Sequence, residues 1–261
     1  MAPRPATVGA EHARPLRRPA ASRPNGSPVI PLRDNIPTKR FPFLTVAIIA
    51  INTAVWIGYE LPDLNRAVLD AGFFPCEVNG SCRAPVGNWA TDAVTSMFMH
   101  GSWIHIAGNM LFLWIFGNNI EDSLGRVRFA VFYLAGGFAA TALQTLVTLQ
   151  FGSTADAEIP NVGASGAIAA VLGAYFLLFP HARVVTLTIF IFITAFELPA
   201  VVFLGLWFLF QLWQGGFDLL APTGSGQGGV AFFAHIGGFA FGLATVKIFA
   251  ARRREAAWPR T

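Results

Sequence analysis

The sequence predicts an all-α integral membrane protein, a bundle of six transmembrane helices. Its composition is 54% hydrophobic and only 12% charged over 261 residues, whereas a soluble domain carries about 25% charged residues. The charges are also clustered, which leaves stretches close to the roughly 20 apolar residues that a helix needs to cross the hydrocarbon. A surface facing water on all sides is therefore excluded.

Six apolar stretches define the expected helices. Residues 184–213 are too long for one span and are interrupted by Glu197 and Pro199. Because proline fits the first turn of a helix, we start the fifth span near Leu198 and lay residues 184–195 along the membrane interface. The expected spans are residues 43–59, 97–120, 129–150, 164–179, 198–213 and 230–250.

The distribution of basic residues predicts the orientation. Of the 18 Lys and Arg, all but Arg66 and Arg83 fall on one side of these spans, and basic residues are retained on the cytoplasmic side. Both termini are therefore expected in the cytoplasm. We expect a bacterial inner membrane, because prolines in the Arg-rich tail oppose the amphipathic helix of an organelle transit peptide and no seventh span is present.

The chain divides into three regions. Residues 1–40 are rich in Pro, Ala and Arg and predict a disordered cytoplasmic tail, residues 41–250 form one membrane domain, and residues 251–261 form a basic C-terminal tail. Cys76 and Cys82 share the first outer loop. They form either a local disulfide or two free thiols. Nothing in the sequence indicates a metal or an organic cofactor.

Polar residues at membrane depth are candidates for function, because they are costly there. In the second span, His105 and Asn109 are four residues apart and share one helical face, whereas His100 is expected to face elsewhere. The alternative for His105 and Asn109 is hydrogen bonding between helices, which is common for these residue types.

Two further polar residues lie at the same expected depth. Ser165 opens the fourth span, where its hydroxyl has no carbonyl one turn earlier to bond. His235 lies in the outer turns of the sixth span and could be a purely structural histidine. Small residues beside both predict that spans four and six pack backbone to backbone and bring Ser165 within reach of His235. They are Gly166, Ala170 and Gly173 in span four, and Gly238 and Gly242 in span six.

Three motifs together resemble the rhomboid intramembrane serine proteases. They are His105-x-x-x-Asn109 in span two, Gly163-x-Ser165-Gly166 in span four, and Ala234-His235-x-x-Gly238-x-x-x-Gly242 in span six. The resemblance covers roughly residues 41–250 and includes Glu121-Asp122-x-x-Gly125 after span two.

The resemblance implies a catalytic role for each of these residues. Ser165 would be the nucleophile and His235 the general base, without a carboxylate. His105, Asn109 and the Ser165 backbone N–H would hold the oxyanion, and Gly163 would leave room for the substrate carbonyl. The chain departs from many members at Trp89, where no arginine follows, and at Ala169, where some members carry a tyrosine that stacks on the histidine.

The leading hypothesis is a serine endopeptidase that cuts single-span membrane proteins near the outer end of the substrate helix. Span five and the glycine-rich loop at residues 223–229 would form its gate and cap. The alternative is a catalytically inactive relative that binds membrane clients. A transporter would require paired charges or broken helices near the bilayer centre, and the only candidate charge, Glu197, is expected near the cytoplasmic edge. The basic tail is explained better by topology and anionic lipid than by nucleic acid.

Overall fold

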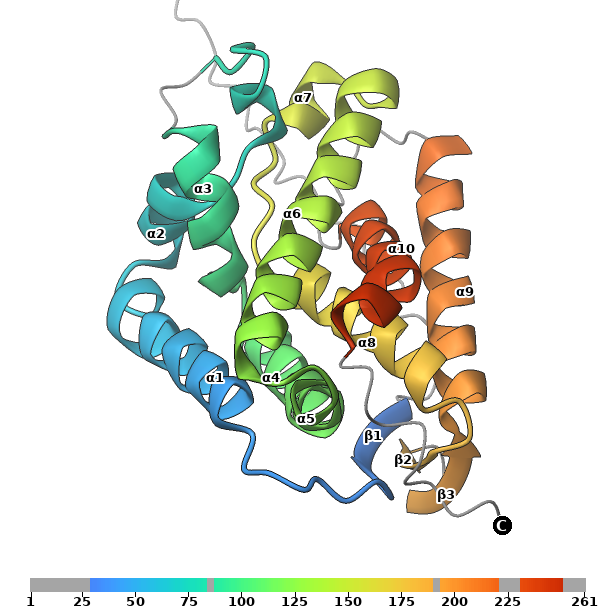
Figure 1. Cartoon of the computed structure of the whole chain (residues 1–261). Helices are drawn as coiled ribbons and strands as arrows, with labels where there is room; N and C mark the ends of the chain where they lie inside the picture. Colours follow the sequence, from blue (N-terminus) through green and yellow to red (C-terminus); the bar gives the residue numbers. More distant parts are fainter. Residues whose placement is uncertain (1–28, 84–86, 190–192, 221–230, 251–261) are drawn as a thin grey trace, which may run out of the picture.

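The structure is a computed structural model that describes residues 29–83, 87–189, 193–220 and 231–250. Figure 1 shows a bundle of helices with a small sheet at one end. The short helices α2, α3 and α7 gather at the opposite end. The sheet end also carries the exposed residues Lys39, Arg40, Arg126 and Arg128. We call this end of the bundle the basic face.

The described part of the chain contains ten α-helices and three strands. Four short π or 3-10 turns lie at Trp56–Glu60, Pro75–Glu77, Ser96–Phe98 and Leu113–Gly117. The strands are β1 (Val29–Asp34), β2 (Arg183–Ile189) and β3 (Ile193–Pro199). The helices are α1 (Phe43–Val55), α2 (Leu64–Ala71), α3 (Trp89–Thr95), α4 (Trp103–Phe112), α5 (Asn118–Leu124), α6 (Arg126–Phe151), α7 (Thr154–Ala157), α8 (Ser165–Leu178), α9 (Ala200–Leu220) and α10 (Phe232–Phe249).

Four helical segments within the described residues are long and apolar enough to cross a membrane, fewer than the six expected. They are Phe43–Glu60, Arg126–Phe151, Ala200–Phe217 and Phe232–Phe249. The membrane character of the bundle agrees with the sequence prediction, but the count of six is not confirmed. The two remaining expected spans correspond to a helical run that includes a π turn and to a short helix.

The expected second span begins later than its hydropathy indicated. Ser102 caps α4 by accepting a hydrogen bond from the His105 backbone N–H at 3.2 Å, so helix formation starts only at Trp103. The run then continues through a π turn into α5 and ends at Leu124. Residues before Ser102 therefore do not follow the periodicity of this helix.

The fourth expected span, α8, is the centre of the bundle. It has 14 residues, ten of them buried, and at about 1.5 Å per residue it is roughly 21 Å long. Because the hydrocarbon is about 30 Å thick, α8 cannot cross it alone. Figure 1 shows α8 enclosed by α6, α9 and α10, with its last residues toward the basic face. Ser165, at its first turn, therefore lies below the opposite surface.

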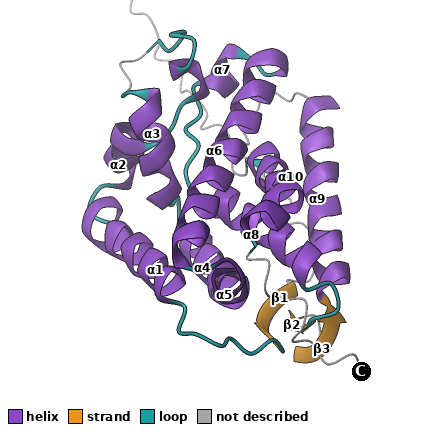
Figure 2. Cartoon of the chain, viewed as in Figure 1, coloured by secondary structure: helices purple, strands orange, loops and turns teal. Residues whose placement is uncertain are grey.

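The expectation of an all-α fold is wrong at the basic face, where β1, β2 and β3 form an antiparallel sheet in that order (Figure 2). Residues 184–195 belong largely to this hairpin, and α9 begins at Ala200 rather than near Leu198. The expected disordered tail likewise extends too far, because β1 pairs with β2. Asp34 docks β1 by accepting hydrogen bonds from Tyr175 Oη at 2.6 Å and Asn119 Nδ2 at 2.5 Å.

The open question about the two cysteines has an answer in the structure. Cys76 and Cys82 form a disulfide, with their Cα atoms 5.0 Å apart. Cys76 is buried with Phe74 and Ala157 in a small cluster away from the main core. The disulfide therefore constrains the loop between α2 and α3, and Cys76 packs this loop against α7.

Glycines allow α8 and α10 to pack against each other at backbone distance. A Cβ atom on Gly238 would overlap the Gly166 carbonyl oxygen, and one on Gly242 would overlap that of Ala170. A Cβ on Gly173 would overlap the Phe239 carbonyl oxygen. Gly166 differs from the expectation, since its own Cα faces α6, where a Cβ would lie 2.6 Å from the Ala140 Cβ.

Candidate active site

Ser165 is the first residue of α8, a position that frees both of its polar groups. The preceding residue, Ala164, is a cap without a side-chain acceptor, and the first N–H groups of a helix lack partners within the helix. Ser165 is partly exposed, and its hydroxyl makes no hydrogen bond to any described residue. A hydroxyl and a backbone N–H are thus presented together at the positive end of a helix.

Gly163 brings this helix start against α4. Its φ of +132° favours glycine, and its N–H donates to the Ser96 carbonyl oxygen at 2.8 Å. A Cβ on Gly163 would lie 2.8 Å from His105 Nε2 and 3.5 Å from Ser165 Oγ. The imidazole of His105 and the Ser165 hydroxyl therefore both border the space that the missing side chain of Gly163 leaves. His105 is the nearer of the two to that space.

The hydrogen bonds around His105 and Asn109 determine what they can donate. The Gly101 N–H donates to His105 Nδ1 at 3.3 Å. Since a neutral imidazole has one accepting and one donating nitrogen, the proton of His105 is on Nε2, the atom beside Gly163. Asn109 is 8% exposed, and its buried Nδ2 has no acceptor among the described residues. Buried donors are almost always paired, so this amide is free for a ligand oxygen.

His100 does not face away from His105, as the helical spacing suggested. Their rings are in edge contact, with centroids 5.1 Å apart. The reason is that His100 precedes α4, so the angle per residue of a helix does not apply to it. His100 is fully buried, and its backbone N–H donates to Glu60 Oε1 at 2.5 Å.

Two residues of α9 that the sequence analysis did not single out hold His235. Gln211 is 5% exposed, and its Oε1 lies 2.8 Å from His235 Nδ1. Because Oε1 can only accept, Nδ1 carries the proton and Nε2 has a free lone pair. The Trp207 ring lies 5.7 Å from the His235 ring, so α9 supplies the aromatic neighbour missing at Ala169. The available sequence signal was Gln211 itself, one of two glutamines in a largely apolar helix.

Ser165 and His235 lie on helices that cross beside them. Gly238, one turn after His235, contacts the Gly166 carbonyl. Ser165 and Ala234 both line a cavity of about 30 Å³. Its other lining residues include Thr141, Gln144 and Asn161. That volume is sufficient for a water molecule. Among the described residues no hydrogen bond joins Ser165 Oγ to His235, and the glycine-rich loop expected to cap the site lies outside them.

Comparison with known proteins identifies a family. Residues 88–252 match the family model described as Rhomboid domain. The mitochondrial presenilin-associated rhomboid-like protein A of Danio rerio is 32% identical over 72% of this chain and 46% of its own length. The mitochondrial rhomboid protein 1 of Saccharomyces cerevisiae is 29% identical over 72% of this chain and 52% of its own length. The chain thus spans about half the length of these curated relatives.

The relatives contradict the expected location in a bacterial inner membrane. Both proteins are mitochondrial by name, as is RHOMBOID-like protein 6 of Arabidopsis thaliana, which is 35% identical over 34% of this chain. The prolines of the N-terminal tail were therefore too weak an argument about the compartment. The multi-pass character of the chain agrees with the comparisons.

Proposed function

Since this chain belongs to the rhomboid family, we propose that it is an intramembrane serine endopeptidase that hydrolyses peptide bonds in or near the span of single-span membrane proteins. Ser165 acts as the nucleophile and His235 as its general base. His105, Asn109 and the Ser165 N–H form the oxyanion hole. The reaction needs no metal or cofactor.

The first half of the reaction forms an acyl-enzyme. Ser165 Oγ attacks the carbonyl carbon of the scissile bond while its proton passes to His235 Nε2. The Gln211 oxygen holds the opposite nitrogen of the ring and thereby keeps Nε2 as the base. Negative charge develops on the substrate oxygen, and His105 Nε2–H, Asn109 Nδ2–H and the Ser165 N–H stabilise it.

The second half releases the products. His235 returns its proton to the leaving amine nitrogen, which breaks the peptide bond and leaves the acyl group on Ser165. A water molecule, for which the cavity between Ser165, Gln144 and Asn161 has room, then attacks the ester. His235 takes the proton of this water and returns it to Ser165 Oγ as the intermediate collapses, which breaks the ester bond, releases the carboxylic acid and regenerates the free serine.

One observation carries the proposal: the protonation pattern that the hydrogen bonds impose. The bond from Gly101 makes His105 Nε2 a donor, and the bond to Gln211 leaves His235 Nε2 as an acceptor. Acyl transfer requires this pairing of a donor for the oxyanion with a base for the nucleophile. Two structural histidines would have no need of opposite tautomers.

A catalytically inactive family member that binds membrane clients is the second candidate. It is favoured by the missing hydrogen bond between Ser165 and His235 among the described residues. Family membership is equally compatible with both candidates, because the names of the relatives state no proteolytic activity.

Reconstitution separates the two candidates. The purified chain in liposomes is incubated with an apolar single-span peptide that has Gly and Ala in its outer turn and a fluorophore at one end. We expect mass spectrometry to find two fragments, cut at one bond near the end of the span. A peptide that is cross-linked to the chain yet stays intact would establish client binding instead.

Asn109→Ala is expected to reduce kcat about 100-fold with little change in KM, because the amide is engaged only as charge develops on the substrate oxygen. Steady-state cleavage of the same peptide measures both constants. Asn118→Ala, on the same helical run towards the basic face, is the matched control and should retain its rate. A change confined to KM would assign Asn109 to substrate binding.

Gln211→Leu is expected to lower kcat about tenfold, because His235 loses the acceptor that fixes its tautomer. Gln211→Glu still offers an oxygen to Nδ1–H and should retain most of the activity. Rates recorded against pH give the readout, since a purely structural role would leave the profile unchanged in shape. Gln214→Leu is the control, and equal losses in Gln211→Leu and Gln211→Glu would refute a positioning role.

A further inference from the structure

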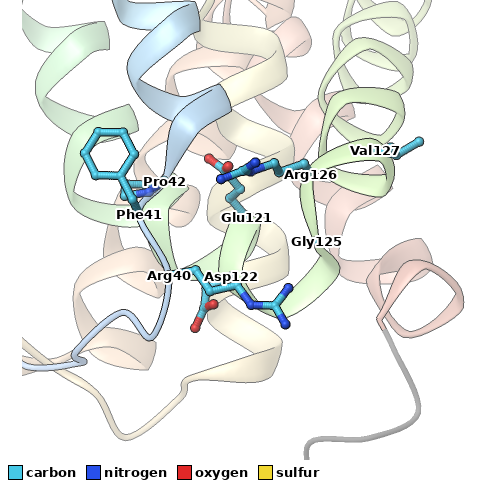
Figure 3. A pocket seen from close by; sticks show the side chains of 8 residues that line it. All are labelled: Arg40, Phe41, Pro42, Glu121, Asp122, Gly125, Arg126 and Val127. Atoms are coloured by element: carbon cyan, nitrogen blue, oxygen red, sulfur yellow. The ribbon is translucent and has the colours of Figure 1, made fainter.

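A second pocket, of about 390 Å³, opens at the basic face, and none of its lining residues lines the cavity at Ser165. Three segments form it: the chain entering α1, α5, and the start of α6 (Figure 3). Its lining includes two arginines, Arg40 and Arg126, and two acids, Glu121 and Asp122. The proposed proteolysis uses none of them.

The acids of this pocket are engaged in holding the fold. Glu121 is 3% exposed and accepts three hydrogen bonds from the start of α1: Leu44 N–H at 3.0 Å, and Thr45 N–H and Oγ1 at 2.8 Å each. Asp122 Oδ2 accepts from the Lys39 N–H at 3.2 Å. Glu121 in particular has little capacity left for a ligand.

The arginines are engaged differently. Within the described ranges, neither Arg40 nor Arg126 forms a hydrogen bond or an ion pair through its guanidinium. Arg126 lies over the Phe43 ring at 5.4 Å, a cation–π contact that orients the group without using its N–H donors. Two exposed guanidinium groups on one hollow match the oxygens of a phosphate, which arginine binds in bidentate fashion.

Apolar side chains continue from this pocket along α6. Val127, which lines the pocket, is 79% exposed, and Phe41 on its other side is 67% exposed. Val131, Leu134 and Phe138 are 53%, 39% and 43% exposed. With Val127 they follow the spacing i, i+4, i+7, i+11, which is one face of a helix.

We propose that this pocket binds the phosphate of a membrane glycerophospholipid through Arg40 and Arg126, with one acyl chain along the face of α6 formed by Val127, Val131, Leu134 and Phe138. The phosphate supplies the charge complement to the guanidinium groups. The apolar face that begins in the pocket favours a lipid over free phosphate. This site is independent of proteolysis.

Lipid binding to the full chain in detergent tests the proposal, with phosphatidylglycerol as the probe and native mass spectrometry as the readout. Arg40→Gln/Arg126→Gln is expected to weaken binding about tenfold or more, because it removes two charge-assisted contacts. The charge-matched control, Arg33→Gln/Arg128→Gln, removes two exposed arginines that do not line the pocket. It should bind within about twofold of the unchanged chain.

Competition distinguishes the source of the phosphate. Inorganic phosphate in molar excess should leave the lipid bound, and diacylglycerol without phosphate should not bind. Equal loss in the control pair would indicate general surface charge and overturn the proposal, as would displacement by inorganic phosphate.

A measurement on the unchanged chain covers the case in which the double variant fails to fold. Phosphatidylglycerol with a photoreactive acyl chain should label the segment from Val127 to Phe138. Labelling confined to other helices would refute the site.

Discussion

Ser165→Ala and His235→Ala are each expected to reduce peptide cleavage by about 10⁴-fold or more, because removing either member of a nucleophile–base pair disables both. In the structure Ser165 is presented at the first turn of α8, and His235 has its Nδ1 occupied by Gln211. The double variant should be no slower than either single one. Initial rates in liposomes with the fluorescent single-span peptide measure this.

Matched controls separate chemistry from folding. Ser123→Ala and His181→Ala change the same residue types on the basic-face side of the bundle and should cut at the unchanged rate. All four variants should keep the helical circular dichroism of the unchanged chain, since Ser165 and His235 are only partly buried. Persistent cleavage by Ser165→Ala would move the nucleophile to another residue.

Gly242→Ala is expected to destabilise the folded chain by about 1–3 kcal/mol, although alanine favours helices. The added methyl group would overlap the Ala170 carbonyl oxygen and lie 2.7 Å from its carbon. Because those atoms are backbone, no rotamer change can relieve the overlap, and α8 and α10 must separate. Thermal unfolding in detergent should show a lower Tm, and cleavage should fall with it.

Gly216→Ala is the control for this substitution. Gly216 lies within α9, where a Cβ would meet no atom within 4 Å. There the same change should leave stability equal or raise it by up to about 1 kcal/mol, as expected for Gly to Ala in a helix. A Gly242→Ala chain as stable as the unchanged one would mean that α8 and α10 do not pack as described.

The small-residue pattern of spans four and six is an instance in which local sequence was sufficient. Glycines at positions 238 and 242 predict that their helix packs closely against a neighbouring helix. In the structure that neighbour is α8. The prediction for Gly166 was less accurate, since it is placed against Ala140 of α6. A helix face can be inferred from spacing, but the neighbour on each side of a crowded central helix cannot.

The sequence by itself determined that this chain is apolar enough for a membrane and that Ser165, His235, His105 and Asn109 lie in motifs that resemble those of the family, because composition and spacing are local properties. Tertiary structure decided the rest. It paired β1 with a hairpin about 150 residues away, set His100 against His105, and placed Gln211 and Trp207 of α9 beside His235. The contacts of β1 and of α9 join segments that are far apart in the chain, and neither segment alone signals its partner. Only the folded packing therefore assigns the His235 tautomer on which the proposed base depends, whereas the His105 tautomer follows from the nearby Gly101 N–H.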